Sequence, residues 1–210
     1  MTYYQIVRAN KEEIVLVWGY AGKKPLIEYI YLPNPKAKLA ARIIKDFPGI
    51  NKSQRKIPSG IDDQIAKLYF GKKENVDLSL LNLKRLSEFS AKVLKATYKI
   101  PRGKVATYSG LAAKICSPRA ARAVGTALAN NPFPLVIPCH RVVRADGTLG
   151  GFGGGSNMKR QLLAKEGVAF DSKGRVSAKC IWQAILTGQV QMVAGGNSLP
   201  GKSRVGVRLH

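Results

Sequence analysis

Cysteine and histidine are scarce in this sequence, with three cysteines and two histidines among 210 residues. Cys116, Cys139 and Cys180 are odd in number and widely spaced, which excludes a disulfide framework and a zinc knuckle and favours a reducing compartment. His140 and His210 are too few for a histidine-rich metal site. We therefore expect no metal ion and no cofactor.

Long apolar runs are also missing. The longest apolar stretches, residues 14–18 and 135–137, fall far short of the ~20 residues that cross a bilayer. The opening residues 1–13 include Arg8 and Lys11 where a secretory signal has an apolar run. We expect a protein without a membrane span, located in the cytoplasm or, in a eukaryote, in the nucleus.

Acidic residues are few, because 12 Asp and Glu stand against 35 Lys and Arg and leave a formal net charge of +23. Such an excess favours a polyanionic partner, either nucleic acid or an anionic membrane surface. No acidic residue lies between Glu88 and Asp146, and this basic stretch would attract a phosphate backbone. With 45% hydrophobic residues, the chain still has the composition of a globular protein with a core.

The first 80 residues have the pattern of a small α/β domain. Two runs rich in β-branched and aromatic residues, 13–19 and 26–32, flank a turn-rich connector and predict a hairpin. Apolar residues at helical spacing predict helices over 37–47 and 62–70. The polar segment 75–82 is the expected boundary of this domain.

The following part of the chain is predicted to be helical. Helices are expected over 86–98, 108–115 and 120–129, the last with Ser117 as its N-cap. Two short helices joined by a tight turn, the second rich in alanine and arginine, predict a helix-turn-helix. The expected organisation is therefore an N-terminal domain over 1–80, a DNA-binding and catalytic domain over 81–186, and a flexible basic tail over 187–210.

Cys139 is a candidate nucleophile because it follows the apolar run 135–137 and stands beside His140. A thiol with a pKa of ~8.5 is a poor nucleophile until a base or a positive charge favours the thiolate, and His140 and Arg141 could supply either. For an arbitrary Cys-His pair, a small buried cysteine and a satisfied core histidine are the commoner outcome. The predicted helix-turn-helix before the pair and the glycine-rich segment 149–155 after it favour the nucleophile.

The segment Pro138-Cys139-His140-Arg141 is preceded by Asn131-Pro132 and followed by the glycine-rich loop. In this arrangement the chain resembles the O6-alkylguanine-DNA alkyltransferases, or methylated-DNA–protein-cysteine methyltransferases. The resemblance is strong over about residues 100–170 and weak over the first 80. It implies an α+β fold, with a small α/β (ribonuclease H-like) N-terminal domain and a helical C-terminal domain that carries the helix-turn-helix. Further matches in the order and spacing of the family are Val105–Ser109, Ala120–Val124 and Leu162–Gly167.

The resemblance implies that Cys139 takes the alkyl group from O6 of a damaged guanine in DNA, which restores guanine and consumes the protein in one turnover. His140 would activate Cys139 through a bridging water, and Glu166 would orient His140, as a carboxylate can hold a buried base. Tyr108 would donate a hydrogen bond to guanine N3, and Asn131 would tie the recognition helix to the nucleophile. By spacing alone, these residues could instead be a helix-surface carboxylate (Glu166), an aromatic that caps the core (Tyr108) and a helix C-cap (Asn131).

The target carbon lies inside the duplex, so the nucleotide must leave the base stack. Arg122 matches the family's finger residue, on a helix whose small residues allow close approach to the minor groove. Without the cysteine motif, the same pattern fits an alanine-rich core helix with a solvated arginine. In the base pocket, the Val142 carbonyl would accept from the guanine amino group, Phe152 would pack on the base, and the Gly153 N–H would face O6. The expected DNA-contacting positions are Arg119, Ala120, Ala121, Arg122, Ala123 and Gly125.

The sequence departs from the family pattern at Phe152, where many members have tyrosine, and at Gly153, where some have serine. One alternative function is a protein that recognises alkylguanine damage without repairing it, against which the retained Cys139 argues. Another is a helix-turn-helix transcriptional regulator, which leaves Cys139 and His140 unexplained. A cysteine hydrolase is weaker, because its histidine would lie far from the cysteine in sequence. We expect a monomer that acts on double-stranded DNA containing O6-alkylguanine.

Overall fold

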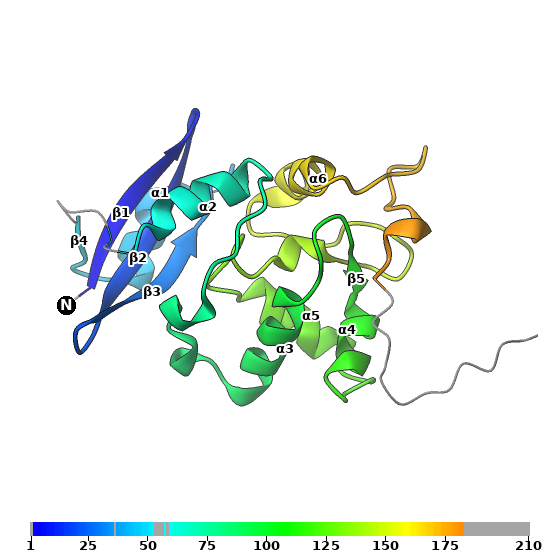
Figure 1. Ribbon diagram of the computed structural model, residues 1–210, viewed down its shortest axis with the longest axis horizontal. Helices are drawn as coiled ribbons and strands as arrows, with labels where there is room; N and C mark the ends of the chain where they lie inside the picture. Colours follow the sequence, from blue (N-terminus) through cyan, green and yellow to red (C-terminus); the bar gives the residue numbers. More distant parts are fainter. Residues whose placement is uncertain (1, 36, 53–56, 58, 183–210) are drawn as a thin grey trace, which may run out of the picture.

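The computed structural model describes residues 2–35, 37–52, 57 and 59–182. The fold is mixed α+β. In Figure 1 a four-stranded sheet lies on the left, and most of the helices of the second half lie to its right. The order of the strands in the sheet is β3-β2-β1-β4, with β1, β2 and β3 antiparallel and β4 parallel to β1. The strands are β1 (Thr2–Ala9), β2 (Glu12–Ala21), β3 (Lys24–Tyr31) and β4 (Asn51–Lys52).

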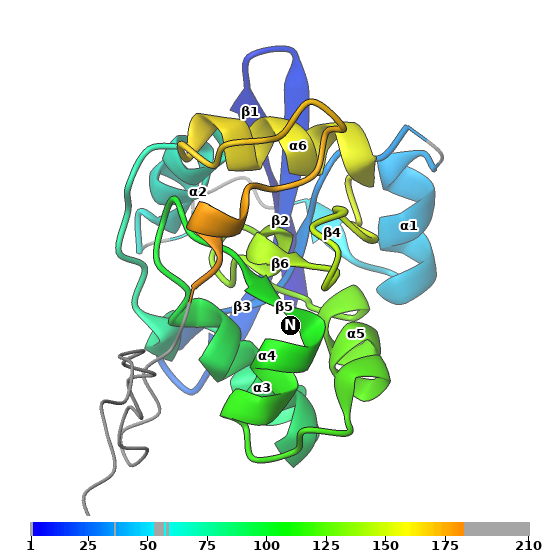
Figure 2. The same cartoon turned by 90° about the vertical axis from the view of Figure 1, so that its right-hand side faces the viewer.

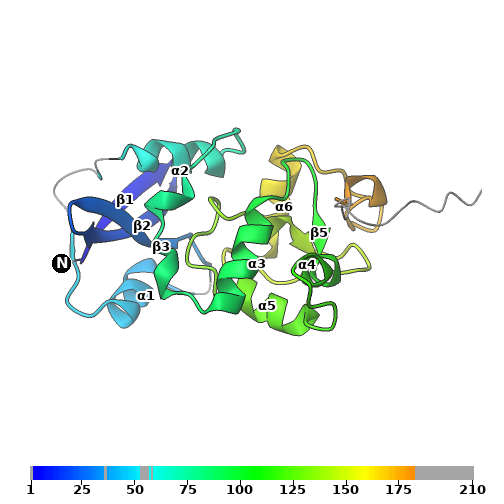
Figure 3. The same cartoon turned by 60° about the horizontal axis from the view of Figure 1, so that its bottom comes forward.

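Strands β2 and β3 form the predicted hairpin, whereas β1 and β4 were not predicted. The interior of β2 is buried on both faces, since side chains alternate across a strand. Ile14, Leu16 and Trp18 pack with α2 (Ile61–Tyr69), and Val15 and Val17 pack with α1 (Leu39–Asp46). The sheet therefore lies between two helices, as Figure 3 shows.

The helices α1 and α2 confirm the two helices predicted in the first half, with ends that differ by a few residues. Helix α2 begins after Gly60, which has a left-handed conformation, and carries Asp62 and Asp63 in its first turn, where carboxylates favour the helix dipole. It ends before Gly71, whose φ of +75° only glycine adopts without cost.

The second half contains four α-helices and a short parallel pair of strands among the described residues. Ser87 caps α3 and Thr107 caps α4, each by accepting a hydrogen bond from a backbone N–H of the first turn. The predicted helices over 86–98, 108–115 and 120–129 are confirmed apart from their ends. These elements are α3 (Glu88–Tyr98), β5 (Ala106–Thr107), α4 (Tyr108–Lys114), α5 (Ala121–Ala129), β6 (Val142–Val143) and α6 (Gly155–Lys165).

The predicted N-cap of α5 was wrong. Ala120, not Ser117, occupies the cap position, and no side chain caps the helix. Ser117 instead accepts a backbone hydrogen bond from the Ala120 N–H at 2.9 Å, so it belongs to the turn between α4 and α5. The helix begins one turn later than a Ser-Pro start signal indicates, and Ala120 precedes it.

The two halves are joined by one apolar core. A single cluster of buried side chains includes Ile27 and Ile30 of β3 together with Val93 and Leu94 of α3. The predicted boundary segment packs against the sheet, because the Asn82 N–H donates to the Ile27 carbonyl at 2.9 Å. The predicted tail over 187–210 lies outside the described residues.

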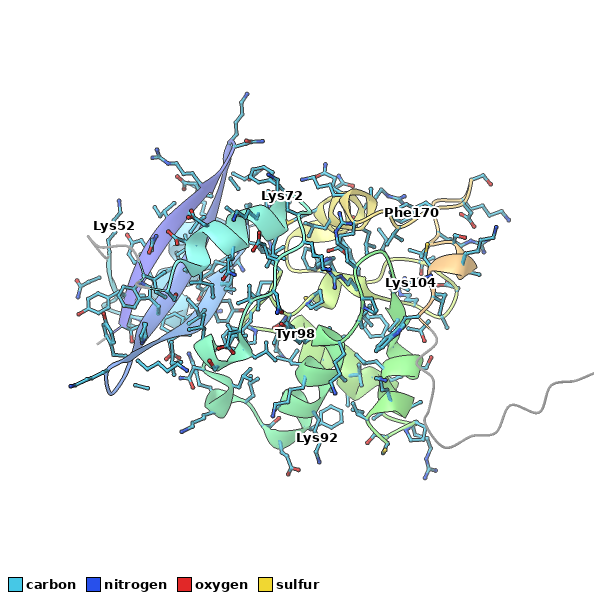
Figure 4. All side chains as sticks on the ribbon, viewed as in Figure 1. Lys52, Lys72, Lys92, Tyr98, Lys104 and Phe170 are labelled. Atoms are coloured by element: carbon cyan, nitrogen blue, oxygen red, sulfur yellow. The ribbon has the colours of Figure 1, made fainter. Side chains whose placement is uncertain are left out.

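The basic character of the sequence is visible on the surface. The labelled side chains of Lys72, Lys92 and Lys104 in Figure 4 are exposed. Within residues 2–182, apart from the few undescribed positions, no helix is both long and apolar enough to cross a bilayer.

Candidate active site

Cys139 begins a short 3-10 helix, Cys139–Arg141, that follows the buried residues 135–137. The Cys139 side chain is half-buried and lines a cavity of about 360 Å³. Asn131 holds the approach to this turn, because its amide donates to the Ile137 carbonyl at 3.0 Å and accepts from the Phe133 N–H at 3.0 Å. The other residues that line the cavity are Tyr108, Gly125, Leu128, Ala129, Gly151, Phe152 and Gly153.

His140, Glu166 and Arg141 form a buried hydrogen-bonded cluster. His140 Nε2 lies 3.0 Å from Glu166 Oε1, and the Arg141 guanidinium donates to both oxygens of Glu166 at 2.8 and 2.9 Å. Arg141 also donates to the Ile100 carbonyl at 2.7 Å. Because Glu166 is 7% exposed, it is not the helix-surface carboxylate that its spacing alone would favour. The carboxylate holds the orientation of the imidazole ring.

Glu166 is ionised because of its partners in this cluster, whereas burial keeps His140 neutral. Burial alone would raise the pKa of Glu166, but the hydrogen bonds and charges of His140 and Arg141 lower it to about 2. Burial lowers the pKa of His140, and the hydrogen bond to Glu166 only partly opposes this effect. With Nε2–H donated to Glu166, Nδ1 of the neutral ring is the basic atom. His140 Nδ1 is buried and has no hydrogen-bond partner among the described residues.

Lys159, which the sequence reasoning missed, is a second charged group at the site. It is fully buried, and its ammonium donates to the Val142 carbonyl at 2.7 Å and to the Gly151 carbonyl at 3.3 Å. Burial raises the pKa of the Cys139 thiol, while a hydrogen bond from Asn131 and the charge of Lys159 lower it. Burial also lowers the pKa of Lys159 to about 8. The lysine therefore favours a thiolate at Cys139.

The walls of the cavity come from α4, α5 and the loop between β6 and α6. Tyr108 is the first residue of α4, and a Cβ added to Gly150 would lie 2.9 Å from its hydroxyl oxygen, so only glycine fits at this approach. Gly125 of α5 faces the same ring, because an added Cβ there would lie 3.8 Å from a Tyr108 ring carbon. Phe152 packs edge-to-face on His140 with ring centroids 6.1 Å apart.

The predicted DNA-contacting residues lie in and just before α5. Arg119 and Arg122 are exposed, and Ala123 is exposed beside them. Neither arginine makes a salt bridge to a carboxylate in the described part of the chain. The remaining positions, Ala120, Ala121 and Gly125, are partly exposed. This surface combines small side chains with positive charge. Gly125 belongs to it and also lines the cavity.

The chain is similar to known proteins of one family. A family model described as "6-O-methylguanine DNA methyltransferase, DNA binding domain" matches residues 88–168. A methylated-DNA–protein-cysteine methyltransferase of Methanothermobacter thermautotrophicus is 45% identical over 112 residues, which cover 53% of this chain and 62% of the relative. One from Methanosarcina barkeri is 35% identical over 164 residues, which cover 78% of this chain and 96% of the relative.

This chain belongs to the methylated-DNA–protein-cysteine methyltransferase family. The first curated relatives are matched over slightly less than two thirds of their length, 62% and 64%. Among solved structures, a Mycobacterium tuberculosis OGT in complex with DNA has a TM-score of 0.62 and 31% identity, covering 79% of this chain and 92% of that chain. The O6-methylguanine-DNA methyltransferase of Pyrococcus kodakaraensis has a TM-score of 0.60 and 28% identity, covering 80% and 100%.

In this member of the methyltransferase family, most of the predicted site residues lie together. Cys139, Tyr108, Phe152 and Gly153 line one cavity. The remaining catalytic candidates do not line it: His140 follows Cys139 and is hydrogen-bonded to Glu166, and Asn131 is hydrogen-bonded to Cys139. The Val142 carbonyl, expected to face a guanine amino group, already accepts from Lys159, which leaves its second lone pair.

Proposed function

We propose that this protein repairs O6-alkylguanine in double-stranded DNA by transferring the alkyl group to Cys139. The observation that supports it most is the half-buried Cys139 on the wall of a cavity, backed by a buried neutral histidine that a carboxylate orients. The transfer occurs once per molecule, because a thioether on Cys139 cannot be displaced by these groups. The activity is that of a methylated-DNA–protein-cysteine S-methyltransferase.

The chemistry begins with loss of the thiol proton of Cys139. His140 accepts this proton at Nδ1, through a bridging water as in the family, and Glu166 stabilises the imidazolium that forms. The thiolate attacks the alkyl carbon, a carbon–sulfur bond forms, and the bond between that carbon and O6 breaks. Its electron pair passes to the guanine ring, where the Tyr108 hydroxyl stabilises the developing negative charge at N3 by hydrogen bonding, and the ring then takes a proton from water to become guanine.

The base reaches Cys139 by leaving the duplex. Residues 108–129 act as a helix-turn-helix in which α5 enters the minor groove, and its alanines and Gly125 permit close approach. Arg122 fills the space that the flipped nucleotide leaves, which offsets part of the few kcal/mol that unstacking costs. In the cavity, Phe152 stacks on guanine and the Gly153 N–H donates to O6.

The remaining assignments concern the domains, the oligomeric state and the location of the protein. We assign the four-stranded sheet and its two covering helices to a ribonuclease H-like N-terminal domain over residues 1–80, and residues 81–186 to a DNA-binding and catalytic domain. We expect the protein to act as a monomer where chromosomal DNA is accessible, in the cytoplasm or in a eukaryotic nucleus.

The test mixes the protein with a duplex containing a single O6-methylguanine and measures intact mass and peptide masses. The expected result is a gain of one methyl group on the peptide that contains Cys139, no gain with undamaged duplex, and no gain in Cys139→Ala. Tight lesion-selective binding without transfer would instead identify a damage-recognition protein. Binding without lesion preference would identify a DNA-binding regulator, and either result would overturn the proposal.

A further inference from the structure

One segment of the N-terminal half makes two hydrogen bonds to residues around Cys139. The Ile30 N–H of β3 donates to the Pro132 carbonyl at 2.8 Å, next to Asn131. The Asn34 amide donates to the Gly153 carbonyl at 2.7 Å, on the wall of the cavity. The two donors are only four residues apart, so one short segment contacts both the approach to Cys139 and the cavity wall.

This segment is held rigidly enough to position a loop. Asn34 stands between Pro33 and Pro35, whose rings restrict the backbone on both sides. The Arg42 guanidinium, from α1, donates to the Leu32 carbonyl at 2.9 Å. In Figure 2, α1, the helix that follows this segment, lies on one side of the strands, and α2 lies on the other.

The loop that Asn34 contacts cannot define its own shape. Residues 150–155 contain five glycines and Phe152, and glycine loses more conformational freedom on ordering than any other residue. Gly151 and Gly153 have no atom within 4 Å of an added Cβ, so packing does not fix them. Two side chains hold their carbonyls instead: Lys159 donates to Gly151 at 3.3 Å, and Asn34 donates to Gly153 at 2.7 Å.

We infer that Asn34 is a positioning residue that keeps the cavity wall over residues 150–155 in its base-binding conformation. This inference rests on the proposed function. Asn34 touches neither the nucleophile nor the reacting atoms. It raises the fraction of molecules in which the Gly153 N–H and Phe152 face the cavity, and apparent affinity falls in proportion to that fraction.

The effect of Asn34 should therefore fall on binding and not on chemistry. A side chain to backbone hydrogen bond at a partly exposed site corresponds to about a fivefold change in an equilibrium constant. Asn34→Ala should raise the half-saturating concentration of the free base O6-benzylguanine about fivefold. The limiting rate at saturation and the pH profile of transfer should stay as in the wild type, because at saturation the bound base keeps the loop, and with it Phe152 against His140, in the same conformation.

The experiment measures single-turnover transfer from O6-benzylguanine at a series of concentrations, together with hydrogen exchange of the loop amides by mass spectrometry. Asn34→Asp, which has the same shape but cannot donate, should behave like Asn34→Ala. Asn51→Ala, a change at an exposed asparagine of the edge strand β4, is the matched control and should behave like the wild type. In both Asn34 variants the amides of residues 150–155 should exchange about fivefold faster.

An unchanged half-saturating concentration, a loss confined to the limiting rate, or wild-type behaviour of Asn34→Asp would overturn the inference. Loop exchange equal to that of the wild type would also overturn it. Absence of transfer by the wild type would refute the proposed function instead, and the exchange measurement would still decide the role of Asn34.

Discussion

Glu166→Gln tests whether the charge of the buried carboxylate holds the catalytic cluster. The pKa of Glu166 falls from an ordinary 4.5 to about 2 in the folded protein. Each pH unit of such a difference corresponds to about 1.4 kcal/mol, so the ionised carboxylate contributes about 3 kcal/mol to stability at neutral pH. Because the folded pKa lies below the unfolded one, this contribution is complete above pH 4.5 and is lost as the pH falls toward 2.

The expected result is a variant that is less stable than the wild type by about 3 kcal/mol at pH 7, with a difference that shrinks steadily below pH 4.5. Urea unfolding at several pH values, followed by tryptophan fluorescence, measures it. Glu88→Gln is the control, because Glu88 pairs with Lys92 on the exposed face of α3 and should matter little. A stability difference that is the same at pH 3 and pH 7 would refute the electrostatic reasoning. The variant should also transfer alkyl groups about 10²-fold more slowly, since the base loses its orienting anion.

Three further changes test other parts of the site. Lys159→Met should raise the pKa of the Cys139 thiol, so the rate at which iodoacetamide alkylates Cys139 should begin to rise at a higher pH. Labelling across a pH series measures this shift. A profile that does not move would contradict the role of the Lys159 ammonium. Arg122→Ala should slow transfer from a duplex that contains the lesion at least tenfold but leave transfer from free O6-benzylguanine unchanged. An equal loss with both substrates would contradict the proposal that Arg122 replaces the flipped nucleotide in the duplex. Gly150→Ala would place a Cβ 2.9 Å from the Tyr108 hydroxyl oxygen at a residue whose φ is +68°. It should destabilise the fold by more than about 1 kcal/mol and slow transfer. Thermal unfolding and the transfer assay measure the two effects.

The hairpin and the main helices were predictable because their signals are local. Alternating and β-branched residues mark β2 and β3, and helical spacing of apolar residues marks α1, α2 and α3. Strand β4 has two residues, Asn51 and Lys52, and exists only because β1 pairs with it, so no local pattern could reveal it. Ser117 failed as a cap because residues 117–120 form a turn before the helix: the Ser117 carbonyl accepts from the Ala120 N–H, and α5 begins only after Ala120.

The site residues also differ in how far the sequence alone could predict them. The motif around Cys139 pointed to the proposed nucleophile and its neighbour from the sequence. Glu166 needed the resemblance, because its burial against Arg141 depends on residues 25 positions away. The burial of Lys159 could not be predicted from the sequence, because a lysine in a helix is normally solvated. Its partners are carbonyls of β6 and of the glycine-rich loop, which come close to it only in the folded protein. Asn34 was equally hidden, because its partner Gly153 lies 119 positions along the chain.

The central claim is that Cys139 is an acceptor that is used once. The most direct measurement titrates a fixed amount of protein with excess duplex containing O6-methylguanine and counts methyl groups per protein molecule by intact mass, with the site located by peptide fragmentation. The account predicts that the count stops at one, on Cys139, and that an equal amount of guanine is restored in the DNA. Repair that continues beyond one lesion per protein, or a methyl group found on Cys116 or Cys180, would contradict it.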